Sequence, residues 1–394
     1  MSRDRYTIVS ADGHAGADVD DYRPHLESYW LDEFDRWRGQ FVNAWSDLES
    51  AGRERNWDNA VRQRDLEADG IVAEVLFPNT IPPFFPSGQL AAYPPRTTEE
   101  RTRRSAGLRA HNRWLADWCA ELPRRRAGLA QVFLGDVEAA VAEVEWAAGA
   151  GLKGILVPAI PPDQGIPPLW SDVYDPLWAA CTHHDLAITQ HGGSGLPDLS
   201  ESPAPGFLML MEVPFFANRS LWHLILGGAF ERFPELRFAM TEQRVDWVPA
   251  TIAKMDVFWT RFTEQGAVGE MGADPVQLPH PPSFYFERNC WLGASFPGAR
   301  EATVIEQIGP SRVMWGSDYP HREGTTPHSR EALRYAFHDW EPSVLHDVLG
   351  GTAAEVYRLD LDELAGHGIG PTVDEIAEPI TDLPDSPSIA FAAV

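Results

Sequence analysis

The residues best suited to chemistry stand directly after short apolar runs. Asp12 and His14 are two positions apart near the N-terminus, and Asp318 and His321 are three apart in the run 313–322. Side chains at i and i+2 of a strand point the same way, so Asp12 and His14 can reach one metal ion. The same Asp-Gly-His letters also fit a turn with a solvated histidine. An aspartate such as Asp318 is a hard metal ligand and a proton acceptor for metal-bound water.

Two further polar residues end apolar runs in the middle of the chain. His191 is followed by Gly192 and Gly193, which leave room for a ligand close to the backbone. A satisfied histidine in a turn after the strand fits the same letters. Glu242 ends the run 239–242. If the strands are parallel and form a barrel, their carboxyl ends meet, and all six side chains converge on one site.

Eight apolar runs of β type alternate with segments of helical pattern. The runs are apolar almost throughout, which is typical of strands buried on both faces. A β-then-α order with eight strands predicts a (β/α)8 TIM barrel, although a chain of 394 residues is also long enough for two domains. We expect strands at 7–14, 72–79, 128–136, 151–159, 186–191, 237–242, 289–296 and 312–321, and helices at 99–122, 137–150, 172–184, 219–233 and 299–308.

Three stretches interrupt this alternation. Residues 18–69 form a charged, Trp-rich insertion after the first strand, 81–96 are rich in proline and aromatic residues, and 265–283 are rich in glycine and proline. The second and third are placed to be loops over the carboxyl ends of the strands. We expect residues 1–365 to form the barrel domain and 366–394 an extended C-terminal tail, which packs on its own barrel or on a neighbouring copy.

Composition narrows the class of partner and compartment. The formal net charge is −26, whereas nucleic acids and anionic membranes require a basic surface. The three cysteines have no paired spacing, which indicates a reducing compartment. Neither a signal peptide nor a run of 18 apolar residues is evident. The sequence therefore predicts a cytoplasmic enzyme acting on a small-molecule substrate.

Several of these motifs resemble the amidohydrolase superfamily. The resemblance is to the amidohydrolase-related branch, which includes aminocarboxymuconate semialdehyde decarboxylase and the resorcylate-type decarboxylases. Its specific pieces are Trp-Gly-Ser-Asp-Tyr-Pro-His at 315–321 and the Phe-Pro-Glu-Leu block at 233–236, and residues 353–357 resemble the closing helix of the family. The other matching pieces lie at 10–14, 76–79, 190–192, 228–236 and 242–249.

The resemblance implies a distorted (β/α)8 barrel that holds one divalent metal, with zinc in first place and manganese in second. Carried over by position, His14 and His191 are imidazole ligands, and Asp318 is the carboxylate ligand and proton shuttle. Asp12 is a first ligand if it aligns with the ligand-x-His pair of the family. In the other register Asp12 lies behind the ligands and Gly16 occupies that position. The resemblance also implies a homodimer.

Two reactions fit such a site. We put first the hydrolysis of a small amide, lactone or cyclic imide by metal-activated water. The alternative is nonoxidative decarboxylation of an aromatic or dienoic acid. Family decarboxylases place a histidine where this chain has Glu242, which favours hydrolysis. Asp318, Glu242 and His321 are the expected catalytic residues, although His321 could instead only pack its loop. A barrel without catalysis, which only binds, is a remote alternative, because it has no need of such a set of ligands.

Overall fold

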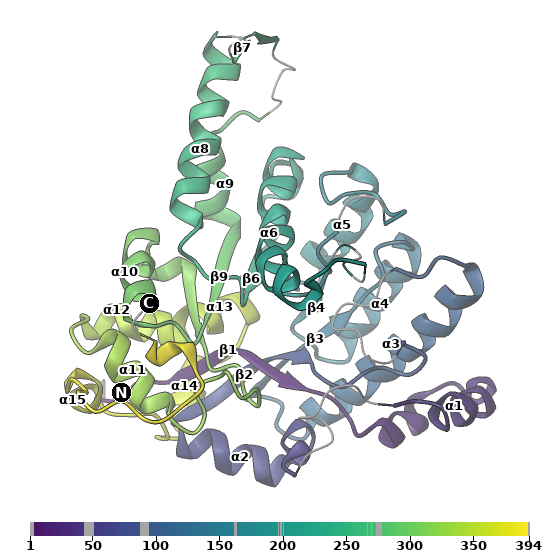
Figure 1. The fold of residues 1–394 in the computed structure, drawn as a ribbon, viewed down its shortest axis with the longest axis horizontal. Coiled ribbons are helices and arrows are strands. Elements are labelled where there is room, and N and C mark those ends of the chain that lie inside the picture. The colour runs from purple at the N-terminus through teal and green to yellow at the C-terminus, as the bar shows by residue number, and fades with distance from the viewer. Residues whose placement is uncertain are drawn as a thin grey trace.

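Eight parallel strands form the centre of the molecule. The computed structural model describes residues 4–42, 51–86, 94–160, 164–195, 197, 199, 201–265, 267–268, 270–272 and 278–392. The strands of the large sheet are β1 (Ile8–Ala15), β2 (Ile71–Pro78), β3 (Arg126–Gln131), β4 (Gly154–Leu156), β5 (Ala187–His191), β6 (Phe238–Thr241), β9 (Cys290–Ser295) and β10 (Val313–Gly316). They are hydrogen-bonded in this order (Figure 1). The predicted (β/α)8 barrel is therefore confirmed.

Helices surround the strands, as Figure 1 shows. Several begin with a side-chain cap; for example, Thr97 accepts a hydrogen bond from the backbone N–H of Glu100 at 3.1 Å. The helices are α1 (Leu31–Arg38), α2 (Asn59–Ala68), α3 (Thr98–Ala120), α4 (Val137–Gly149), α5 (Asp175–His183), α6 (Pro205–Leu226), α7 (Ala229–Arg232), α8 (Val248–Thr260), α9 (Pro282–Asn289), α10 (Ala299–Ile308), α11 (Ser329–Phe337), α12 (Pro342–His346), α13 (Thr352–Tyr357), α14 (Leu361–Ala365) and α15 (Val373–Ala377).

The barrel closes between its first and last strands just beyond the end of β10. The backbone N–H of His14 donates to the carbonyl of Tyr319 at 2.7 Å, and that of Asp318 donates to the carbonyl of Asp12 at 2.9 Å. Gly316 makes this approach feasible, because a Cβ there would lie 2.5 Å from the Cβ of Asp12. Closure thus fixes two of the expected ligand-bearing segments against each other.

Small and branched side chains fill the barrel interior, including those of Val9, Ala11 and Ala239. Residues of α13 belong to the same apolar cluster, which matches the closing helix expected at 353–357. Because Arg237, which precedes β6, donates to the carbonyl of Val356 at 3.0 Å, α13 lies at the amino ends of the strands. The opposite, carboxyl ends remain available for a site.

The expected loops differ in where they lie. Residues 81–82, 85–86 and 94–96 line a pocket at the carboxyl ends of the strands, as expected, whereas 87–93 lie outside the described residues. The described part of 265–283 instead lies at the outer end of an arm built by α8 and α9, which projects from the body (Figure 1). The two-stranded pair β7 (Ala267–Val268) and β8 (Met271–Gly272) belongs to this arm, and no described residue of it lines the pocket.

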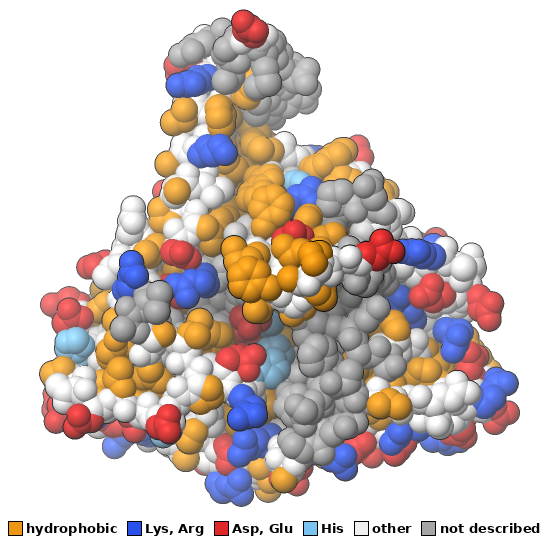
Figure 2. Space-filling view, viewed as in Figure 1, with side chains coloured by type: hydrophobic (Ala, Val, Ile, Leu, Met, Phe, Trp, Pro, Cys, Tyr) orange, Lys and Arg blue, Asp and Glu red, His pale blue; other side chains and the backbone are white. Residues whose placement is uncertain are grey.

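Helix α6 is longer than predicted and carries exposed apolar side chains. It starts at Pro205 and continues through Pro214, whereas the pattern indicated a start near residue 219. Its exposed residues form an apolar area that is visible in Figure 2. They are Phe207, Leu210, Met211 and Phe215.

The C-terminal segment packs on the barrel. The backbone N–H of Tyr6 donates to the carbonyl of Pro371 at 3.0 Å, α15 contacts α11, and Phe391 packs beside Phe296. Among the described residues, no helix is long and apolar enough to cross a membrane.

Candidate metal centre and pocket

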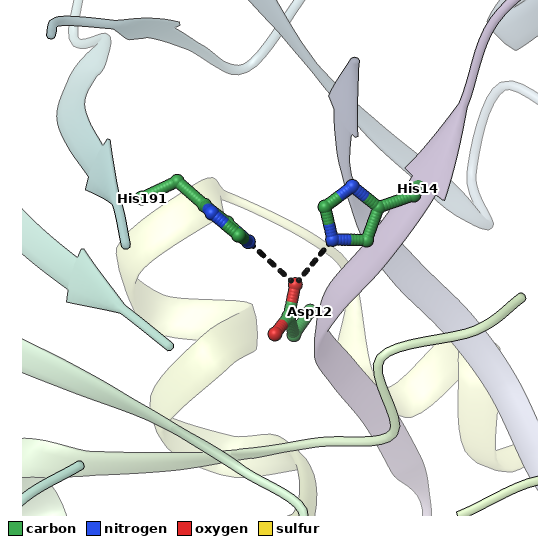
Figure 3. A group of neighbouring side chains, drawn as sticks. All are labelled: Asp12, His14 and His191. Atoms are coloured by element: carbon green, nitrogen blue, oxygen red, sulfur yellow. Dashed lines mark ion pairs between the residues drawn. The ribbon is translucent and has the colours of Figure 1, made fainter. Parts of the chain in front are cut away.

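Asp12, His14 and His191 come together at the carboxyl ends of β1 and β5. Figure 3 shows both imidazole rings directing one nitrogen at the same carboxylate oxygen of Asp12. The Nε2 atoms of His14 and His191 lie 3.3 and 3.4 Å from Asp12 Oδ1. All three side chains are buried or nearly so. The sequence thus predicted a real cluster from residues that are up to 179 positions apart.

Asp318 completes the cluster from the segment after β10. Its Oδ1 lies 3.2 Å from His14 Nε2, and the residue is fully buried. The backbone of Asp318 has φ of 59°, and Glu242 after β6 has φ of 56°. Non-glycine residues seldom adopt this left-handed conformation, and those that do are concentrated at functional sites. The backbone turns of both segments therefore serve to aim a carboxylate.

Four ligand atoms of this cluster are buried and have no hydrogen-bond partner among the described residues: Asp12 Oδ1, His14 Nε2, His191 Nε2 and Asp318 Oδ2. Unpaired buried polar atoms are costly and rare, so four of them on neighbouring side chains require an explanation. A divalent cation with imidazole and carboxylate ligands satisfies all four at once. The donor set therefore fits a metal.

The remaining ring nitrogens of the two histidines point to backbone carbonyls. His14 Nδ1 lies 3.4 Å from the carbonyl of Pro78, and His191 Nδ1 lies 2.7 Å from that of Gly192. A hydrogen on Nδ1 leaves the Nε2 lone pair for a metal, which is the usual arrangement of metal-binding histidines.

Electrostatics favour a positive charge inside the cluster. Burial alone lowers the pKa of His14, but the carboxylates of Asp12 and Asp318 outweigh it and raise that pKa well above its ordinary value. Burial alone raises the pKa of Asp12, yet its interactions with His14 and His191 bring that pKa below the ordinary range. A cation bound in the cluster is thus stabilised by two buried carboxylates, which it also neutralises.

Glu242 stands beside the cluster on the pocket wall. Its Oε2 lies 3.2 Å from His191 Nε2. Burial raises the pKa of Glu242 to about 7; His191 opposes this rise, and the charges of Asp318 and Asp12 add to it. Gly192 allows the two strand ends to approach, because a Cβ there would lie 2.3 Å from the carbonyl oxygen of Glu242. The glycine after His191 therefore makes room for Glu242 rather than for a ligand.

His321 is held by two partners. Its Nδ1 lies 2.7 Å from Asp318 Oδ1, and its Nε2 lies 3.0 Å from Asn79 Oδ1. Both nitrogens are thus engaged, so His321 supports Asp318 instead of offering a free lone pair. It also lines the pocket, where it can contact a substrate.

Sequence reasoning gave no role to three residues that support the ligands. Ser295, the last residue of β9, donates a hydrogen bond to Asp12 Oδ2. Asn79 follows β2 and holds His321. Arg62 of α2 donates through Nη1 to the carbonyl of His14 at 2.7 Å. Ser295 and Asn79 could have been found by inspecting every strand end for hydrogen-bonding residues as well as for ligands.

The cluster opens into a pocket of about 1540 Å³. His14, His191, Glu242 and His321 line its inner part. The ring of Phe77 lies there too, with its centroid 4.6 Å from that of His191. The site therefore combines a metal-binding cluster, a neighbouring carboxyl group and an aromatic wall.

The sequence profile of the amidohydrolase family matches residues 41–359, well over half of the chain. The chain belongs to this family. His191, Glu242 and Asp318 lie within the matched range, whereas Asp12 and His14 precede it. The suspected superfamily is thereby confirmed, and the structure adds the two ligand candidates of β1 to the matched part.

Relatives of this amidohydrolase include a gamma-resorcylate decarboxylase from Polaromonas sp. strain JS666, 24% identical over 233 residues that cover 56% of this chain and 68% of the relative. The solved 5-carboxyvanillate decarboxylase from Novosphingobium aromaticivorans, with manganese and 4-hydroxy-3-methoxy-5-nitrobenzoic acid, has a TM-score of 0.66 and 20% identity, covering 91% of this chain and 100% of that one.

The solved dihydroxybenzoic acid decarboxylase from Polaromonas sp. strain JS666, with manganese and 2-nitroresorcinol, has a TM-score of 0.61 and 19% identity. The match covers 89% of this chain and 97% of that one. At this level of identity, the similarity to the solved structures shows a shared fold.

Proposed function

We propose that this amidohydrolase is a nonoxidative decarboxylase of aromatic acids that depends on one divalent metal. The convergence of four partnerless, buried ligand atoms carries the proposal. Decarboxylation is favoured over the hydrolysis that the sequence put first, because the curated relative and both solved relatives described above are named as decarboxylases. Manganese in both of those structures favours manganese over zinc.

His14, His191, Asp318 and Asp12 are the proposed ligands. Asp12 is assigned as a ligand rather than a supporting residue because its Oδ1 faces both histidines and has no hydrogen-bond partner. When bound, the metal supplies a positive charge that binds substrate oxygens and stabilises negative charge developing on the substrate. Ser295 occupies the other oxygen of Asp12 and so fixes its orientation.

The protein must orient an aromatic ring and deliver a proton. In the reaction the bond between the ring carbon and the carboxylate carbon breaks, carbon dioxide leaves, and the electron pair remains on the ring carbon, which then takes up a proton. We assign this proton to Asp318, supported by His321 at 2.7 Å, or to Glu242 across the site. Phe77 offers a flat apolar surface for the ring.

One observation favours hydrolysis as a second candidate. Glu242 occupies the strand end where the family resemblance leads us to expect a histidine, and its carboxyl group faces the pocket. A carboxylate there can accept a proton from an attacking water, as hydrolysis of a lactone or amide requires.

The test measures both reactions on one metal-loaded preparation. Release of carbon dioxide is followed with a panel of hydroxybenzoates and other aromatic carboxylates, and hydrolysis with a panel of lactones and amides. We expect about one divalent ion per chain and carbon dioxide release that is lost in Asp318→Asn. Hydrolysis without carbon dioxide release would replace the proposal by the second candidate. A chain that stays metal-free in excess manganese and zinc would refute both.

A further inference from the structure

The pocket is larger than a single-ring acid requires. Ligand pockets usually measure roughly 300–1,000 Å³, whereas this one measures about 1540 Å³. It extends from the metal cluster toward the N-terminal part of α3 and the segment after β3. A substrate that fills it must therefore reach well beyond the site of decarboxylation.

The outer part of the pocket is flat, aromatic and basic. Phe85 and Phe133 line it and stack with their rings 6.0 Å apart at an angle of 7°. Arg104 lies against both, with its guanidinium carbon 4.4 Å from the Phe85 ring centroid and 5.4 Å from that of Phe133. Arg101, one helical turn earlier, and Arg96 also line this part.

Arg104 is part of the buried wall of the pocket rather than a surface charge, because the residue is only 2% exposed. Burial lowers the pKa of its guanidinium. Glu100 Oε1 lies 3.2 Å from Arg104 Nη1 and belongs to a side chain that is 40% exposed. Among the described residues, Arg101 has no ion-pair partner.

Among the described residues that line this end of the pocket, positive charge predominates. Arg96, Arg101 and Arg104 face the pocket, and Asp136 is the acidic residue that lines it nearby. Asp136 caps α4 by accepting from the N–H of Ala139 at 3.1 Å, so its carboxylate is already engaged. In a chain with a net charge of −26, a group of three arginines in one pocket points to an anionic ligand.

We propose that this end of the pocket is an anion subsite and that the substrate is an elongated aromatic acid with a second carboxylate. Arg101 and Arg104 bind the distal carboxylate, and the Phe85–Phe133 pair packs against the intervening apolar part. The orientation of such a substrate, with its reacting carboxylate at the metal cluster, rests on the proposed function. The subsite itself does not.

A matched pair of probes tests the subsite. Both carry a nitrophenol, the kind of group bound in the solved relatives: 4-hydroxy-3-nitrobiphenyl, and the same compound with a carboxylate at the 4′ position. Affinity for the manganese-loaded protein is measured by calorimetry at low salt. Charged hydrogen bonds predict that the carboxylate tightens binding about tenfold to hundredfold, and that added salt weakens this preference.

Three variants locate the effect. Arg101→Gln and Arg104→Gln should each lose most of the preference for the carboxylated probe while keeping the affinity for the uncharged one. Arg101 is partly exposed, so its variant remains informative if Arg104→Gln fails to fold. Arg103→Gln is the matched control, since Arg103 lies on α3 with Arg101 and Arg104, pairs with Glu33 of α1 and does not line the pocket. It should keep the full preference.

The outcomes separate the two proposals. Equal affinity for both probes in the unmodified protein, or a preference that persists in Arg101→Gln and Arg104→Gln, would overturn the anion subsite and leave decarboxylation standing. A preference that depends on Arg101, in a protein that releases no carbon dioxide from any aromatic acid, would support the subsite and refute the proposed function.

Discussion

The buried ion pair of Arg62 and Glu74 offers a sharp test of how the metal cluster is supported. Arg62 Nε and Nη2 donate to the two oxygens of Glu74 at 2.7 and 2.6 Å, and the two side chains are only 1% and 4% exposed. Arg62 Nη1 binds the carbonyl of His14, and the guanidinium lies 4.7 Å from the ring centroid of Tyr319. One side chain thus contacts both segments that carry the proposed ligands at the barrel closure.

We expect Arg62→Met to lower the free energy of unfolding by about 3–5 kcal/mol, because Glu74 is left as a buried, unpaired charge. That loss is large beside a total of about 5–15 kcal/mol. The double variant Arg62→Met with Glu74→Leu removes both charges and should recover part of this loss. A deficit of about 1–3 kcal/mol should remain, since the carbonyl of His14 loses its Arg62 donor.

Urea unfolding measures these energies, and manganese titration of the folded proteins gives the second readout. The double variant should bind manganese about 10–100-fold more weakly, as expected when support behind a ligand is lost. Arg109→Met is the control; its partly exposed pair with Glu27 should contribute less than about 1 kcal/mol and leave manganese affinity unchanged. Unaltered manganese affinity in the double variant would refute the positioning role of Arg62. A cost below 1 kcal/mol in Arg62→Met would refute the energetic reasoning.

Further predictions concern the site, the metal and the pH dependence of stability. Glu242→Gln should lower turnover by about 10²–10⁴-fold at unchanged metal content if Glu242 transfers the proton, and unchanged turnover would assign that proton to Asp318. Removing manganese with a chelator should lower the unfolding free energy by about 2.7 kcal/mol relative to protein with free manganese at a hundred times its Kd, and an unchanged thermal midpoint would contradict a site formed only in the folded state. Burial lowers the pKa of His111 to about 3, with Tyr22 Oη 2.8 Å from its Nδ1. The unfolded state binds this proton below pH 6.5 and the folded state does not, so stability falls as pH drops from 6.5 toward 3, by about 2 kcal/mol at pH 5. His111→Gln should flatten this slope in urea unfolding measured at several pH values, and an identical slope would exclude His111 as its source. Homodimerisation stays a prediction, which a monomeric mass in light scattering would contradict.

The strands were predictable because strands that are buried on both faces consist of short, almost continuously apolar runs in the sequence. Each observed strand of the barrel falls within about two residues of, or inside, its expected range. The bounds of helix α6 and the arm of α8 and α9 were harder to predict. Pro214 interrupts the pattern of α6, so its first half was missed, and the pair Gly227–Gly228 ends it before the expected end at 233. The spacing of apolar residues in the sequence does not indicate how far α8 and α9 project from the body.

The proposed ligands were predictable for a different reason. Asp12, His14, His191 and Asp318 are polar residues at the carboxyl ends of apolar strands, and barrel closure brings such ends together whatever their separation along the chain. The supporting residues Ser295 and Asn79 share that position at strand ends, whereas Arg62 does not. Arg62 lies on a helix of the insertion and acts on a backbone carbonyl, an acceptor that every residue possesses. The sequence can thus indicate which atoms could bind a metal, whereas the support from Arg62 becomes visible only once the insertion is packed against the barrel.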